Sequence, residues 1–67
     1  MSNIFFYDTE KGYIVVKKIS IAGESNIIFI DKFTDGLNFS YTIKGNFSKK
    51  NIESFLTLKF KKFIKIK

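Results

Sequence analysis

The sequence contains no cysteine and no histidine. It therefore lacks the thiol nucleophile, the most frequent general base of enzymes, and the usual soft or borderline metal ligands. Its four glycines lie in separate predicted turns, so they do not form a glycine-rich phosphate loop. We predict a protein that is not an enzyme, with no catalytic residues, no metal site and no cofactor.

Long hydrophobic runs are also missing. The longest are IFFY, YIVV and IIFI, whereas a transmembrane helix needs about 20 apolar residues. The first residues do not combine a basic stretch with an apolar one, as a signal peptide does. These absences predict a cytoplasmic protein and disfavour a membrane as its partner.

Arginine, proline, tryptophan and glutamine are absent too, while Ile, Lys, Phe and Asn make up 37 of the 67 residues. AT-rich codons produce this bias, so the lack of arginine is not read as a functional choice. Sixty-seven residues predict a single domain over 1–67, and such a chain buries only about 60% of its unfolded surface. Nine Phe and three Tyr compensate, because each buries roughly 150–250 Å².

Four short segments rich in β-branched and aromatic residues alternate with turn signals, which is the pattern of strands. The predicted strands are Asn3–Tyr7, Tyr13–Ala22, Asn26–Phe33 and Leu37–Lys44. Each turn contains a glycine: Gly12 ends the first, Gly23-Glu24 is typical of a II′ turn, and Asp35-Gly36 of an I′ turn. Three successive hairpins give an antiparallel four-strand meander.

The two later turns predict a register. The second hairpin pairs Ser20 with Ile27, and the third pairs Ile30 with Tyr41 and Ile28 with Ile43. Because opposite residues share a face, one face collects a predicted core: Phe5, Tyr7, Val15, Ile19, Ile21, Ile28, Ile30, Phe39, Tyr41 and Ile43. The other face is mixed, and its apolar part needs a cover, which the C-terminal segment, a second copy of the protein or a ligand would supply.

The C-terminal segment carries two competing periods. Ser48 is a candidate cap for a short helix over Lys49–Phe55. Beyond it, a period of two sets an apolar side against a basic side and fits better than a helical period. We predict a fifth strand from Leu56 to Lys67, with Leu56, Leu58, Phe60, Ile64 and Ile66 on the apolar side.

The predicted fold is a small all-β domain: an antiparallel four-strand meander, a short helical turn and a closing fifth strand. This order resembles that of small SH3-like barrels, so we expect such a barrel or a strongly curled sheet. The resemblance concerns architecture alone and implies no function.

The charge is unevenly distributed. Residues 1–43 have a net charge of −1, whereas residues 44–67 hold eight lysines against Glu53 alone, a net of +7. Such asymmetry predicts an anionic partner, although lysines also serve solubility and prevent strand-edge aggregation. The candidate partner-binding residues are Lys49, Lys50, Lys59, Lys61, Lys62 and Lys65, with Phe63 as the aromatic contact.

A second candidate surface lies on the mixed face, where Lys18 accompanies Phe29 and Phe33, with Phe6 nearby. Aromatic rings beside lysines favour single-stranded nucleic acid, because bases stack on the rings. Buried core packing is the usual role of Phe in strands and competes with this interpretation. Asp31 interrupts the third strand diagonally from Lys18, which predicts an ion pair or an inward charge that blunts sheet pairing.

These observations favour a non-catalytic binding protein. The first hypothesis is a regulator or inhibitor, of the kind encoded by phages and other mobile elements, that docks on nucleic-acid-handling machinery such as a host defence complex. The alternative is a single-stranded nucleic-acid-binding module. Either is compatible with a homodimer formed through the mixed face or an exposed strand edge.

Overall fold

The computed structural model describes residues 3–32 and 38–67 and contains five strands and one helix. The strands are β1 (Ile4–Thr9), β2 (Gly12–Ile21), β3 (Glu24–Lys32), β4 (Asn38–Lys44) and β5 (Phe63–Lys65), and the helix is α1 (Lys49–Lys59). Their order in the sheet is β4-β3-β2-β1-β5, and every pairing is antiparallel. The small all-β fold with a four-strand meander, a helix and a fifth strand is confirmed.

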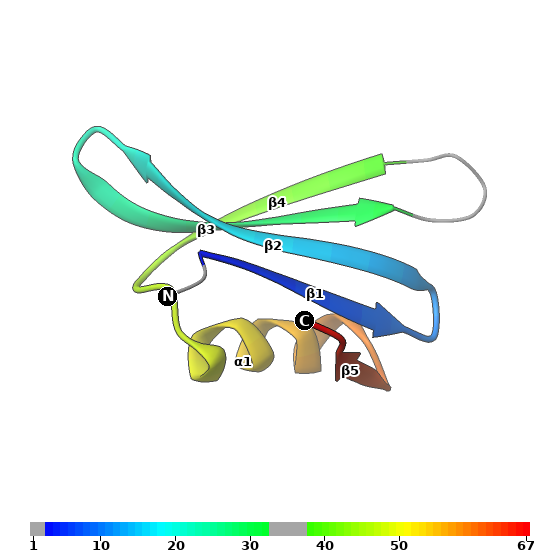
Figure 1. Ribbon diagram of the computed structural model, residues 1–67. Helices are drawn as coiled ribbons and strands as arrows, with labels where there is room; N and C mark the ends of the chain where they lie inside the picture. Colours follow the sequence, from blue (N-terminus) through cyan, green and yellow to red (C-terminus); the bar gives the residue numbers. More distant parts are fainter. Residues whose placement is uncertain (1–2, 33–37) are drawn as a thin grey trace.

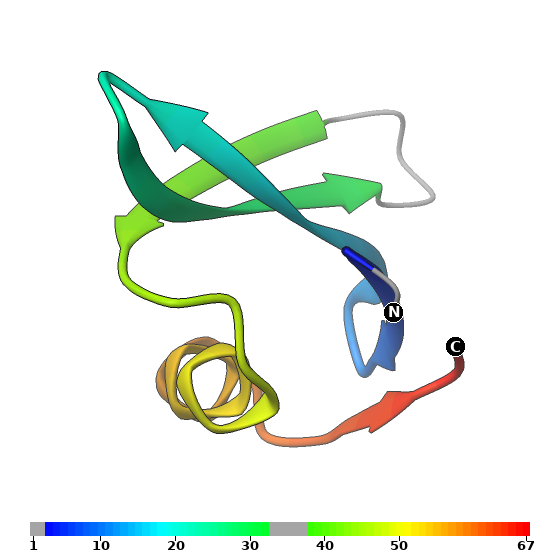
Figure 2. The ribbon, with the colours of Figure 1, turned by 60° about the vertical axis from the view of Figure 1, so that its left-hand side comes forward.

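The sheet is strongly twisted and open, and α1 lies across one of its faces (Figure 1). β5 pairs with β1 and not with β4, so the strands do not close into a barrel. Of the two predicted forms, the curled sheet is the one observed. Figure 2 shows that α1 and β5 lie on the same side of the meander formed by β1 to β4.

The second hairpin turns one residue earlier than predicted. Ile21 pairs with Glu24, so the central residues are Ala22 and Gly23. Both have positive φ values, 52° and 81°, which is the type I′ pattern rather than II′. Ser20 consequently pairs with Ser25 and not with Ile27.

The predicted register of the third hairpin is wrong by one residue. Ile30 pairs with Ser40, Phe29 with Tyr41 and Ile27 with Ile43. A slip of one residue moves every side chain of a strand to the opposite face. The side chains of Tyr41 and Ile43 therefore share a face with Phe29, not with Ile28 and Ile30. The predicted Asp35-Gly36 turn lies outside the described residues.

The sheet residues Ile14, Val16, Ile27 and Phe29 of the core come from the face predicted to be mixed, which corrects the predicted core in part. Tyr7 is a core residue as predicted, and the predicted core residues Phe5, Tyr41 and Ile43 pack against the cluster. Fully buried side chains from the sheet meet the buried side of α1, and the cluster consists of Tyr7, Ile14, Val16, Ile27, Phe29, Ile52, Leu56 and Phe60. The predicted core residues Ile19, Ile28 and Ile30 are half-buried on the outer face, and Ile21 is exposed. The cover that the mixed face required is thus supplied by the C-terminal segment.

The predicted strand over Leu56–Lys67 is wrong for all but three of its residues, because α1 continues to Lys59 and β5 spans only Phe63–Lys65. Ile52 and Leu56 lie one turn apart on the buried side of this helix, as the i, i+4 spacing requires. The Ser48 side chain accepts a hydrogen bond from the Asn51 N–H at 3.2 Å and caps the helix as predicted. The tyrosyl O–H of Tyr7 donates to Glu53 Oε2 at 2.9 Å and ties β1 to α1.

Candidate anion-binding surface

Five of the eight lysines between positions 44 and 67 lie at the two ends of α1 instead of in one row. Lys49 and Lys50 occupy the first turn, Lys59 ends the helix, and Lys61 and Lys62 follow it. A helix of eleven residues is about 16 Å long, so the two groups are separate. The single basic row predicted from an extended segment does not form.

The group at the carboxyl end of α1 is held by an acidic residue of the β1–β2 turn. The Glu10 carboxylate accepts hydrogen bonds from the backbone N–H groups of Lys61 and Lys62, both at 3.0 Å. These two bonds lower the pKa of Glu10 from its ordinary value. Since Glu10 binds the backbone, the ammonium groups of Lys61 and Lys62 stay exposed to solvent.

Lys59 is directed back over the sheet. Its Nζ lies 5.3 Å from the centroid of the Tyr41 ring and 5.8 Å from that of Phe55. These are cation–π distances, so Lys59 covers the aromatic edge of the core as well as carrying charge.

Phe63 and Lys65 of β5 both contact residues of β1. The Phe63 ring packs edge-on against Tyr7, with centroids 6.0 Å apart, and is half-buried. The Nζ of Lys65 lies 4.5 Å from the centroid of the Phe5 ring. Phe63 therefore packs as a core aromatic, with little of its face available to a ligand.

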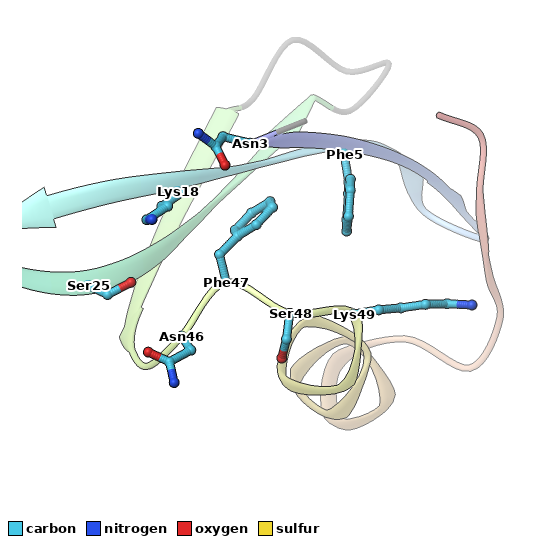
Figure 3. A pocket seen from close by; sticks show the side chains of 8 residues that line it. All are labelled: Asn3, Phe5, Lys18, Ser25, Asn46, Phe47, Ser48 and Lys49. Carbon is cyan, nitrogen blue, oxygen red and sulfur yellow. The ribbon is translucent and has the colours of Figure 1, made fainter. Parts of the chain in front are cut away.

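A pocket of about 500 Å³ lies at the amino end of α1. Figure 3 shows the Phe5 and Phe47 rings in this pocket, with Lys18 beside Ser25 and Lys49 extending from the helix. The two ring centroids are 5.1 Å apart. The pocket unites Lys18 and Lys49, which the sequence had assigned to different surfaces, and its lining residues are Asn3, Phe5, Lys18, Ser25, Asn46, Phe47, Ser48 and Lys49.

The electrostatics of this pocket, termed the basic pocket below, favour an anion. The first turn of α1 contains no acidic residue but two lysines. The amino end of a helix carries partial positive charge, so the two lysines there are not neutralised by the dipole. A bound anion would interact favourably with both the lysines and the helix end. In residues 3–32 and 38–67 the one ion pair joins Lys44 to Glu24 at 3.9 Å, so Lys18 and Lys49 have no carboxylate partner.

The predicted secondary surface does not form as an aromatic platform. Phe29 is 0% exposed and stacks on Phe55, with ring centroids 4.4 Å apart. Phe6 lies on the outer face and stacks on Tyr13. Phe33 lies outside the described residues, so of this set Lys18 alone is placed at a candidate site.

Phe5, Phe47, Asn3 and Asn46 were missed as lining residues of the basic pocket. The pocket joins the start of β1 to the loop before α1, and these segments are distant in sequence. Placing them together requires the correct core face, because Phe5 faces α1 only in the observed arrangement. One local signal exists: Lys49 follows the capping Ser48 at the amino end of a helix, where anions bind.

Large aliphatic side chains are exposed as well. They include Ile21, Ile64 and Ile66, and Ile64 is 67% exposed. Ile64 pairs with Asp8 and therefore lies on the outer face, opposite α1. In the part of the chain that is described, no helix is long and apolar enough to cross a membrane, and His, Cys, Asp and Glu form no group of three or more able to hold a metal ion.

The fold and the surface define a class: a small open antiparallel sheet covered by one helix, with basic groups at both ends of that helix. Comparison of the chain with protein-family models, curated proteins and solved structures finds no match.

Proposed function

We propose that this protein is a non-catalytic binding protein that docks on an anionic macromolecular target. The observation that carries the proposal is the concentration of lysines at both ends of α1, with Lys18 and Lys49 both lining a pocket large enough for a ligand group. Clefts lined by one sign of charge concentrate the opposite charge and speed association.

A nucleoprotein, or an acidic surface of a protein that handles nucleic acid, is the target class that fits best. The bias toward AT-rich codons is common among phages and mobile elements, whose small proteins often regulate or inhibit host machinery. A cytoplasmic location belongs to the same proposal.

Binding of a bare single strand is the second candidate, and the aromatic side chains count against it. Sequence-tolerant single-strand binding relies on exposed rings on which bases stack. Phe29 is buried, Phe63 is packed on Tyr7, and the most exposed large apolar side chains are the aliphatic Leu58, Ile64 and Ile66. This balance favours a protein-containing target.

Charge reversal in the basic pocket tests the proposal. We expect Lys18→Glu with Lys49→Glu to weaken binding of polyglutamate and of a single-stranded oligothymidylate, measured by fluorescence anisotropy across salt concentrations. The slope of log K against log salt should fall by about one for each lysine removed, since each contact releases counterions. Lys49→Glu places an anion at the helix amino end and should add roughly 0.3–1 kcal/mol to the free energy of unfolding, so loss of binding would not reflect unfolding.

The matched control is Lys11→Glu with Lys17→Glu. It makes the same change in net charge at exposed positions outside the pocket. Equal losses in both double variants would show that net charge alone attracts the polyanion and would contradict the pocket. Much tighter binding of oligothymidylate than of polyglutamate would favour the single-strand alternative.

A further inference from the structure

β4 is an edge strand with an unpaired side, since β3 is its one partner in the described sheet (Figure 2). The Gly45 N–H donates to the Ser25 carbonyl at 3.1 Å, which identifies Ser25–Gly45 as a hydrogen-bonded pair. Such pairs alternate along an antiparallel ladder. The backbone groups of Tyr41 and Ile43 therefore face β3, while those of Ser40, Thr42 and Lys44 point away from the sheet.

The two sheet edges differ in how they are protected. β5 has three residues and lies in a segment with four lysines between positions 61 and 67. Short strands and lysines are the usual means by which proteins prevent strand addition. β4 is seven residues long, and Lys44 at its end is its one charged residue. Its outward N–H and C=O groups are thus a template for another strand.

A groove runs beside this edge. It has a volume of about 300 Å³ between β4 and α1, and its lining residues are Ile43, Lys44, Asn51, Ser54, Phe55 and Leu58. Leu58 is 82% exposed although it belongs to a helix that packs on the core. A strand added to β4 would lie about 4.8 Å from it, and every second side chain would point toward the α1 side. Those side chains would enter the groove and cover Leu58.

The charge beside the groove is positive. Lys44 lines it, and Lys59 lies over Tyr41, two residues from Ile43 on the same face of β4. Among the described residues no acidic side chain lines the groove, and the exposed ion pair with Glu24 offsets only part of the charge of Lys44. A second copy of this chain would bring another net charge of +6 to the same place, whereas an acidic segment is complementary.

We propose that the β4 edge binds an extended acidic segment of a partner protein, which adds to the sheet as a sixth strand and places alternate apolar side chains in the groove. Main-chain hydrogen bonds supply affinity in this mode of recognition, and the groove supplies specificity. The inference rests on the proposed function for the anionic character of the partner. It assigns the contact to a site separate from the basic pocket.

Thr42 provides a sharp test. Proline is tolerated at edge positions whose N–H faces outward, so Thr42→Pro removes the central donor of the free edge without breaking the ladder with β3. Thr42→Val keeps the N–H and the β-branched shape and is the matched control. The probe is a short peptide in which glutamate alternates with isoleucine. A second peptide has the same sequence with N-methyl groups on the glutamates, and a third has them on the isoleucines.

Binding is measured by isothermal titration and by amide shifts in NMR spectra, with sedimentation equilibrium on each variant. We expect the wild type and Thr42→Val to bind the unmodified peptide equally, Thr42→Pro to bind at least about tenfold more weakly, and one N-methylated peptide to lose binding. Leu58→Ser, at an exposed position, should also weaken binding, because it removes apolar surface from the groove without changing the charge. An intact amide spectrum of Thr42→Pro confirms that it is folded.

Three results would overturn the inference: no binding of the unmodified peptide, equal binding by Thr42→Pro, or a wild-type dimer that Thr42→Pro converts to a monomer. The last would show that a second copy occupies the edge. The basic-pocket variants should bind the unmodified peptide as tightly as the wild type does. Thr42→Pro should bind polyglutamate as tightly as the wild type does. Failure at the edge is therefore distinguishable from failure of the proposed function.

Discussion

Asp31 is an acidic residue that is buried among apolar side chains. It is 2% exposed, lies between Ile14 and Phe39 in the ladders, and its Oδ1 has no hydrogen-bond partner among residues 3–32 and 38–67. Burial raises its pKa from the ordinary value, and the nearby Lys59 ammonium offsets part of the effect. A buried acceptor without a partner costs about 1–3 kcal/mol.

We expect Asp31→Asn to stabilise the protein at neutral pH. The folded-state pKa of Asp31 is raised, so the wild type carries no penalty where the carboxyl is protonated in both states. The penalty grows as pH rises above the ordinary value of 3.8 and is complete above the folded-state pKa. The difference in unfolding free energy between variant and wild type should therefore increase with pH, as urea titrations from pH 3 to pH 7 would measure. A constant difference would show that the carboxylate is not strained by burial.

The sequence singled out Asp31 but not its environment. Its position among apolar neighbours indicated an inward charge, and this is confirmed. The predicted ion pair with Lys18 is not among the ion pairs of the described residues. Lys59 is the charged residue that lowers the pKa of Asp31 and offsets part of the effect of burial, and α1 brings it there from 28 positions away. Local pattern cannot supply such a contact.

At the scale of elements, hairpins were predictable and their registers were not. Alternating β-branched residues and glycines located four strands. The predicted partners were nevertheless wrong, by two positions in the second hairpin and by one in the third. In the second hairpin the partner of Ser20 changed by two positions, from Ile27 to Ser25, so each side chain stayed on its predicted face. In the third hairpin the change of one position moved Tyr41 and Ile43 to the opposite face.

The helix was underestimated for a related reason. Leu56, Leu58 and Phe60 suggested a strand by their spacing of two. Leu56 and Phe60 are instead one helical turn apart and both are buried, whereas Leu58 is exposed. The apolar face of the sheet had to be covered, and tertiary burial decided between two local periods.

Glu10 fastens the C-terminal segment by accepting the Lys61 and Lys62 N–H groups. Its pKa is lowered, so its contribution is present above the unfolded-state value and is lost as pH falls through the folded-state value. We expect Glu10→Gln to increase amide exchange in β5 and to have little effect on β2 and β3. Hydrogen exchange by NMR above pH 5 would measure this.

When the pH falls below the lowered folded-state pKa of Glu10, the wild type should approach the Glu10→Gln variant, because the wild-type carboxyl is then protonated. Asp8→Asn is the matched control, since Asp8 is an exposed neighbour in β1 with no side-chain hydrogen bond among the described residues. Unchanged β5 protection in Glu10→Gln would mean that the β1–β5 pairing suffices to hold the segment.

At the scale of the whole molecule, the placement of the proposed binding surfaces depends on which face of the sheet α1 covers. Its size and fold class followed from length, turn signals and strand composition. The outer face, with Ile64 exposed, and the basic pocket did not, because both depend on which face the helix covers. Both faces of the meander carry apolar residues, and a single sequence gives no criterion for choosing between them.

Leu56 and Leu58 test that arrangement through global stability. A folded chain of 67 residues is expected to have a free energy of unfolding of roughly 3–10 kcal/mol. Leu56 is 0% exposed, so Leu56→Ala should cost about 2–5 kcal/mol, a large share of the total. Leu58 is 82% exposed, so Leu58→Ala should change stability by less than about 0.5 kcal/mol. Thermal and urea unfolding measure both, and similar losses in the two variants would restore the extended interpretation, in which both leucines point to one side.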